Sequence, residues 1–308
     1  MQDAVYETRD GAHVRFKHVR GGDPAATVVF LNGSFFNHHQ WDLLFSRLNR
    51  RATGNGTRLD YIFMDYRGFG DVPPLSRPFT FGAIQADVLE LLDKEQVHGD
   101  VRLVGSSLGS LVGLSLLERL PGRFSSLVVY GLVAPVMPVV RHVREVFDRM
   151  KGQVAGVLSQ HGGDRLDQAS ITPLARAMWD TFVVQYSRTA PAVKARGFTD
   201  AYATYILKYM RCTPVSTILS FLDCITSDAM ENDVTSASFS PGTFQRTDVF
   251  HGVEDLVTPF PDVKSFCEGA GVRSFRPFQG KGHTDVILDG GICDAIAGAV
   301  LSGIKEPT

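Results

Sequence analysis

A serine stands at the centre of residues 105–109, Gly-Ser-Ser-Leu-Gly, between an apolar stretch of strand character and a stretch with helical periodicity. The glycines of this G-x-S-x-G pattern allow a sharp turn, because a side chain at either one would collide with the neighbouring strand or helix. Such a turn lifts the hydroxyl of the central residue out of the sheet. Ser107 is therefore the candidate nucleophile and Ser106 a spacer. The alternative is an ordinary strand-to-helix turn.

A serine hydroxyl is a weak nucleophile that needs a base, and the base needs an orienting group. The segment HGVEDLVTP places Asp255 just after a predicted strand, in a loop closed by Pro259. The segment GKGHTD places His283 in a glycine-rich loop after the next predicted strand. The three residues form a candidate catalytic set. Alternatively, Asp255 is a helix N-cap and His283 a surface residue.

Strand-like apolar runs alternate with helix-length amphipathic stretches, which is typical of a mostly parallel α/β sheet covered by helices on both faces. An N-terminal hairpin is predicted to turn at Asp10-Gly11. Residues 52–58 are predicted to form a polar loop. The predicted strands cover residues 26–33, 61–68, 101–107, 125–133, 247–252 and 274–280, and the predicted helices cover 39–50, 81–97, 108–120 and about 286–304.

The alternation stops near Pro135, and residues 136–240 show only helical patterns. We therefore predict one α/β core formed by residues 1–135 and 241–308, interrupted by an all-helical insertion at 136–240.

Two aromatic stripes mark the helical insertion. Tyr202, Tyr205 and Tyr209 recur on one predicted helix face, and Trp179, Phe182 and Tyr186 recur on another. The stripes either pack the insertion against itself and the core, or line an apolar pocket for an acyl or aryl group. Trp179, Phe182 and Tyr205 are the candidate substrate-binding residues, together with Phe35 of the core.

The composition excludes several classes of protein. Thirty-one basic residues are interspersed with 33 acidic ones for a net charge of −2, so neither a nucleic-acid partner nor a polybasic membrane anchor is expected. The chain shows no signal peptide and no apolar run long enough to span a bilayer. The four cysteines have no metal-ligand spacing, so we expect no metal, no cofactor and a soluble cytoplasmic protein with free thiols.

Several segments together resemble the α/β-hydrolase superfamily over nearly the whole chain. They are the Asn-Gly-Ser turn after the first buried strand, Trp41, and the segments DYRGFG, GSSLG, GVEDLVTP and GKGH. The resemblance implies a lid formed by the insertion and a triad of Ser107, Asp255 and His283. Glu254 is an alternative acid, but the G-x-x-D pattern of the family favours Asp255.

The resemblance also implies two oxyanion-hole donors, the backbone N–H groups of Leu108 and Ser34. At the second of these the chain departs from the common His-Gly pattern of the family and has Asn32-Gly33. Asparagine tolerates tight turns and can hold a loop with side-chain hydrogen bonds. The hole is therefore expected to survive the change.

Two histidines and the DYRGFG segment require a separate interpretation. His38 and His39 are adjacent, which prevents them from chelating one ion as a helical i,i+4 pair does. We expect them to form a solvated loop and a helix start, with substrate binding at the rim of the site as the alternative. Asp65 and Arg67 are assigned a structural role in the glycine turn.

The leading hypothesis is a cofactor-independent serine hydrolase that acts on a small hydrophobic ester or thioester through an acyl-enzyme. The same triad also serves acyl transfer to an alcohol, an amine or a carrier-bound hydroxyl, and carbon–carbon hydrolysis or lyase chemistry. Some relatives use the fold as ligand receptors, which is the third possibility. Epoxide hydrolysis and dehalogenation are disfavoured because those relatives carry an aspartate in the place of Ser107.

Overall fold

The computed structural model describes residues 3–158, 163–165, 209–228 and 239–304. Its centre is an eight-stranded sheet of order β1-β2-β4-β3-β5-β6-β7-β8. The strands are β1 (Ala4–Glu7), β2 (His13–Val19), β3 (Ala26–Leu31), β4 (Leu59–Met64), β5 (Val101–Ser107), β6 (Ser126–Leu132), β7 (Thr247–Gly252) and β8 (Ser274–Phe278). Only the β1–β2 and β2–β4 pairs are antiparallel. This confirms the predicted mostly parallel sheet and the N-terminal hairpin.

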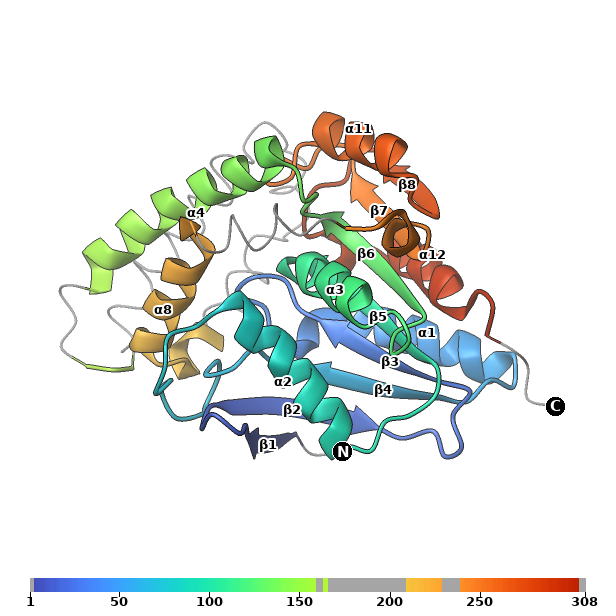
Figure 1. Cartoon of the computed structure of the whole chain (residues 1–308), viewed down its shortest axis with the longest axis horizontal. Coiled ribbons are helices and arrows are strands. Elements are labelled where there is room, and N and C mark those ends of the chain that lie inside the picture. The colour runs from blue at the N-terminus through green and yellow to red at the C-terminus, as the bar shows by residue number, and fades with distance from the viewer. Residues whose placement is uncertain (1–2, 159–162, 166–208, 229–238, 305–308) are drawn as a thin grey trace.

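Helices cover both faces of the sheet (Figure 1). One hydrophobic cluster contains α1 (Asp42–Gly54) and α12 (Gly290–Leu301), which pack against each other. The other contains α2 (Phe81–Lys94), α3 (Leu108–Arg119) and α11 (Phe260–Ala270). Every residue of β3, β4 and β6 is buried, as expected for strands covered on both sides.

The strands on both sides of the helical insertion belong to the same sheet, because β6 pairs with β7 directly. Between them the structure describes α4 (Met137–Leu158) and α8 (Val215–Ile225), which pack against each other, and among the described residues of this span no strand occurs. In Figure 1 both helices lie on the side to which β3, β4 and β6 point. The candidate residues Trp179, Phe182 and Tyr205 fall outside the described residues.

Several boundaries differ from the prediction by a few residues, and three of these differences have a clear local cause. The first long helix runs through part of the expected loop to Gly54, because the left-handed backbone that ends it occurs at Gly56 (φ 72°). Strand β4 ends at Met64, since the following DYRGFG segment forms a turn. The first residues of the predicted last helix form the short 3-10 helix η3 (Asp285–Ile287). The last helix itself begins only at Gly290, because the side chain of Asp289 caps it there.

The closest backbone approach around β5 and α3 requires glycine. A Cβ at Gly109 would lie 2.1 Å from the carbonyl oxygen of Leu31, and one at Gly105 would lie 2.6 Å from that of Gly109. Because both obstacles are backbone atoms, they cannot rotate away. The helix that follows Ser107 can therefore contact β3 only without side chains at these positions.

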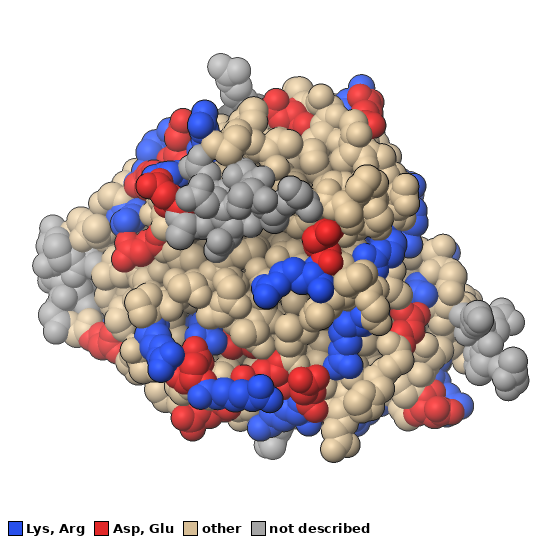
Figure 2. Space-filling model, in the orientation of Figure 1, with Lys and Arg blue, Asp and Glu red and all other residues tan. Residues whose placement is uncertain are grey.

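On the face shown in Figure 2, basic and acidic side chains alternate and neither forms a large patch. None of the helices in the described segments has the length and apolar character that crossing a bilayer requires. All four cysteines are free.

We predict that Gly109→Ala lowers the free energy of unfolding by at least about 2 kcal/mol, because the new methyl group forces α3 away from β3. Urea denaturation followed by circular dichroism measures the change. The matched control is Gly152→Ala, since Gly152 is an exposed residue inside α4 with open space around its Cα. The control should gain about 0.5–1 kcal/mol from helix propensity. Equal stability of Gly109→Ala and the native chain would contradict the close approach.

Candidate active site

Ser107 occupies a strained turn between β5 and α3. Its backbone angles are φ 51° and ψ −116°, a conformation that non-glycine residues rarely adopt. Ser110 stabilises the turn, because its Oγ donates to the Ser107 carbonyl (2.6 Å) and accepts from the Val133 N–H (3.0 Å). Ser106 is buried, whereas Ser107 is partly exposed. The hydroxyl available to a substrate is therefore the one that the motif indicates.

Asp255 and His283 come together although 28 residues separate them in sequence. Asp255 lies beyond β7 and His283 beyond β8, two neighbouring parallel strands. His283 Nδ1 lies 2.7 Å from Asp255 Oδ2. The other carboxylate oxygen, Oδ1, accepts from the backbone N–H groups of Val257 and Thr258, both at 2.9 Å.

Charge and hydrogen bonding keep Asp255 ionised in a fully buried position. Burial by itself raises the pKa of this carboxyl, but the attraction to His283 and His251 whenever either ring is protonated, together with the hydrogen bonds of His283 and Thr258, outweighs it. The net pKa is lower than that of an ordinary aspartate. The carboxylate only accepts hydrogen bonds, so its short contact with His283 requires the proton on Nδ1 and leaves the Nε2 lone pair available.

The imidazole of His283 lies against β6, the strand that pairs with β5. In the β5–β6 pairing Ser106 aligns with Tyr130 and Ser107 with Leu132, so Gly131 is skipped. Gly131 has φ 65°, and a Cβ there would lie 3.1 Å from His283 Cε1 and Nδ1. The missing side chain thus makes room for the ring.

His283 Nε2 is buried and has no hydrogen-bond partner among the described residues, Ser107 included. An orphan buried acceptor is rare, and here it points to a group that arrives with the substrate or with a rotation of the serine side chain.

The loop after β3 lies on the other side of Ser107. The Asn32 side chain donates from Nδ2 to the Met64 carbonyl (2.8 Å) and accepts from Trp41 Nε1 (2.8 Å). A Cβ at Gly33 would lie 3.6 Å from the Ser107 Cβ. Asparagine therefore holds the loop by side-chain hydrogen bonds, as predicted, and brings it to the nucleophile.

Two backbone N–H groups near Ser107 are available to an incoming oxygen. Leu108 is the first residue of α3, whose first-turn N–H groups have no intrahelical acceptor. No hydrogen bond within the described chain uses the Ser34 N–H, while the adjacent Gly33 N–H donates to Gln40 Oε1 (3.2 Å). Both predicted donors thus flank Ser107 in the fold.

The expectation of a solvated His38 is wrong, whereas His39 is exposed. His38 is buried because its Nδ1 lies 3.1 Å from Asp65 Oδ1, which also accepts from the His38 N–H (2.7 Å). Arg67 is buried as well and forms ion pairs with Asp10 and Asp87. Asp65 and Arg67 therefore have the structural role that was predicted.

Phe35, a predicted substrate-binding residue, is fully buried and connects the loop after β3 to the helical insertion. Its backbone is left-handed (φ 63°). Its ring centroid lies 4.9 Å from that of Phe221 in α8 and 6.1 Å from that of Phe147 in α4. The residue packs the insertion onto the turn that carries Ser34.

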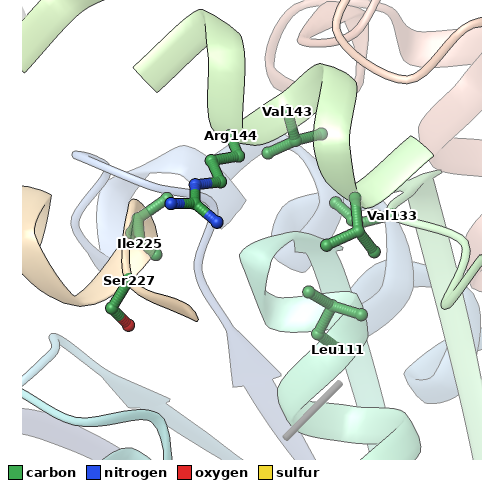
Figure 3. A pocket seen from close by; sticks show the side chains of 7 residues that line it. Leu111, Val133, Val143, Arg144, Ile225 and Ser227 are labelled. Atoms are coloured by element: carbon green, nitrogen blue, oxygen red, sulfur yellow. The ribbon is translucent and has the colours of Figure 1, made fainter. Parts of the chain in front are cut away.

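An apolar cavity lies between the insertion and the core (Figure 3). Leu111 of α3 and Val133 after β6 face Val143 and Arg144 of α4 and Ile225 of α8. The enclosed space is small, with room for about one water molecule, and it opens to solvent. Val133 is the residue whose N–H binds Ser110, so the cavity wall is joined by hydrogen bonds to the turn at Ser107.

Sequence reasoning missed three residues of the site, Gly131, His251 and Thr258. Thr258 Oγ1 donates to Asp255 Oδ2 (2.9 Å), and His251 lies 3.5 Å from the same oxygen. Thr258 stands three residues after Asp255, a spacing at which a carboxylate often binds the backbone N–H of the later residue. His251 and Gly131 lie inside strands and carry no local signal.

The structure agrees with comparisons to known proteins. A hydrolase from Pseudomonas aeruginosa PA01 shares 21% identity at a TM-score of 0.66, and covers 97% of this chain and 97% of its own. A thermophilic esterase from Thermogutta terrifontis shares 17% identity at a TM-score of 0.64, and the match covers 96% of this chain and 97% of the esterase. The epoxide hydrolase CorEH shares 13% identity at a TM-score of 0.68, and the match covers 99% of each chain. At identities this low, it is the TM-scores that establish a common fold.

A search of the curated proteins found no significant match. The family model described as "Alpha/beta hydrolase family", however, matches residues 28–280. The match includes the turn at Ser107 and the Asp255 loop, and it ends three residues before His283. Most of the sheet that was described above lies within the match. The chain is therefore an enzyme of the hydrolase class and belongs to the alpha/beta hydrolase family.

Proposed function

We propose that the protein is a serine hydrolase that cleaves hydrophobic carboxylic esters or thioesters through an acyl-enzyme. Ser107 attacks the carbonyl carbon, and His283 Nε2 accepts the serine proton and then returns it to the leaving group. Asp255 orients the imidazole. Water completes the cycle by releasing the acyl group.

The observation that carries this proposal is the short contact between His283 Nδ1 and Asp255 Oδ2 (2.7 Å) next to a strained Ser107 turn. That contact selects the tautomer with a free Nε2 lone pair, which is the form a general base requires. The N–H groups of Ser34 and Leu108 are the proposed donors to the oxyanion of the tetrahedral intermediate.

The proposed substrate is apolar at its acyl or aryl end. Five aliphatic side chains form most of the cavity wall beside α3, and the aromatic rings around Phe35 exclude water from the same region. An apolar cavity favours a chain without charge, because a buried unpaired charge costs several kcal/mol. Residues 136–240 are proposed to act as the lid over this region.

The thermophilic esterase among the structural neighbours supports the ester assignment by name, while the Pseudomonas aeruginosa neighbour is named only as a hydrolase. Another neighbour is an epoxide hydrolase. The epoxide-cleaving relatives use an aspartate as nucleophile, so the serine at position 107 favours acyl chemistry here. An alcohol, an amine or a carrier-bound hydroxyl could replace water as acceptor, and product analysis with such acceptors present separates hydrolysis from acyl transfer.

We predict that Ser107→Ala abolishes covalent labelling by a fluorophosphonate probe while the circular dichroism spectrum stays native. The probe mimics the tetrahedral intermediate and reacts only with an activated serine. Ser106→Ala is the matched control, because it removes the neighbouring hydroxyl and should leave labelling intact. Intact-mass spectrometry measures the adduct. Labelling that persists in Ser107→Ala would mean that another residue is the nucleophile.

We also predict that kcat/KM for p-nitrophenyl esters rises from acetate to octanoate, by at most about fourfold for each methylene that becomes buried. Val143→Phe should fill the cavity and lower the value for octanoate at least about tenfold more than the value for acetate. Steady-state kinetics of the native protein and of Val143→Phe along the ester series measure the effect. A rate that falls with chain length in the native protein would argue against an apolar substrate.

A further inference from the structure

Thr258 contacts both polar partners of the site at once. Its Oγ1 lies 2.9 Å from Asp255 Oδ2 and 3.3 Å from His283 Nδ1, and its backbone N–H lies 2.9 Å from Asp255 Oδ1. The side chain is fully buried. Because a hydroxyl has one proton and free lone pairs, Thr258 donates to Oδ2 and presents its oxygen to the Nδ1–H of His283.

A second histidine holds the peptide of Thr258 in place. His251 Nε2 lies 2.9 Å from the Thr258 carbonyl oxygen and 3.5 Å from Asp255 Oδ2, and its side chain has no solvent exposure. Burial lowers the pKa of His251, so its ring is neutral and donates from Nε2 to the carbonyl. Thr258 therefore cannot turn away from the carboxylate without breaking this bond.

The surrounding elements add no other group that could replace Thr258. His142 of α4 contacts the Leu256 carbonyl (2.9 Å) at the outer side of the loop. The remaining titratable groups near the carboxylate are Glu254, Asp285, Lys281 and Tyr130. Glu254 is next to Asp255 in sequence, and Lys281 pairs with Asp289. Asp285 accepts a hydrogen bond from the Gly282 N–H, and Tyr130 donates one to the Gly282 carbonyl. None of these forms a hydrogen bond with Asp255 among the described residues.

Resting on the proposed function, we propose that Thr258 is a positioning residue of this active site. Its hydroxyl and its N–H group hold both oxygens of Asp255 so that Oδ2 faces His283. The hydroxyl also shares Oδ2 with the imidazole. His251 is the residue that holds Thr258 in this position.

Two consequences distinguish this role from simple packing. Without the hydroxyl, the carboxylate can rotate, so fewer enzyme molecules present His283 with Nε2 directed to Ser107. In the molecules whose carboxylate still faces His283, Oδ2 has one donor fewer and stabilises the imidazolium more strongly; this outweighs the loss of the neutral hydroxyl oxygen, because Oδ2 is charged and lies closer to Nδ1 (2.7 Å against 3.3 Å). The first effect lowers kcat, and the second moves the acid limb of the pH profile toward higher pH.

The test compares three variants of the full chain. Thr258→Val keeps the shape of the side chain and removes the hydroxyl, while Thr258→Ser keeps the hydroxyl. Thr247→Val is the matched control, because Thr247 is equally buried at the opposite end of β7 and donates only to the Thr243 carbonyl. Each variant is assayed for kcat and KM on p-nitrophenyl butyrate between pH 5 and 9. The low-field proton resonance of His283 Nδ1–H is recorded as a readout that is independent of turnover.

Thr258→Val is expected to lower kcat by about 10- to 100-fold with little change in KM, and to move the acid limb upward by roughly half a pH unit or more. Its Nδ1–H resonance should shift from the native position. Thr258→Ser should restore kcat, the acid limb and the resonance. Thr247→Val should lose stability without moving the acid limb or the resonance.

The proposal is overturned if Thr258→Val keeps the native acid limb and Nδ1–H resonance, or if Thr258→Ser is as impaired as Thr258→Val. Should Thr258→Val not fold, Thr258→Ala and Thr258→Ser are compared by the same resonance, and identical spectra overturn the proposal. Failure here is separable from failure of the proposed function, because fluorophosphonate labelling of the native protein and its loss in Ser107→Ala test the latter alone.

Discussion

The strained turn at Ser107 is the constraint on which the other features of the site depend. A non-glycine residue keeps φ at 51° only where its surroundings leave no alternative. Here the absence of side chains at Gly105 and Gly109 lets α3 begin against β3, and the Ser110 hydroxyl binds the Ser107 carbonyl. The same close approach directs the first-turn N–H groups of α3 toward the space above the serine. One backbone geometry therefore presents the hydroxyl and one of the two proposed oxyanion donors together.

The sheet supplies the remaining parts from both sides of this turn. The loop after β3 lies on one side, held by Asn32, and the loops after β7 and β8 lie on the other. Parallel strands place their carboxyl ends at one edge, so residues far apart in sequence meet there. The skipped residue Gly131 then makes the space that the His283 ring occupies against β6. Each part is placed by backbone that is itself buried and hydrogen-bonded.

The acid of the site shows how a charge is kept in a dry interior. Asp255 has no exposure, yet its two oxygens are met by two backbone N–H groups, one hydroxyl and one imidazole. A carboxylate with this many donors remains ionised despite burial. Under the proposed mechanism its rigidity matters, because His283 is oriented by its hydrogen bond to Oδ2. The helical insertion contacts the same loop where His142 binds the Leu256 carbonyl. It also contacts the loop after β3, where Phe147 and Phe221 pack against Phe35.

The sequence by itself determined the sheet, the serine turn and the identity of Asp255 and His283, because these follow from periodicity, from glycine spacing and from short motifs whose geometry is local. It also determined that Asn32 could hold its loop, since the side chain acts on nearby backbone. Only the tertiary structure decided that His38 is buried against Asp65, that Gly131 makes room for the imidazole, and that Thr258 and His251 surround the acid. The contacts of His38 and Gly131 join different strands and loops, and the distance between such residues is set by strand pairing rather than by any pattern along the chain. The contacts of Thr258 and His251 lie within β7 and the loop after it, but which of these side chains turn toward Asp255 depends on how that loop folds.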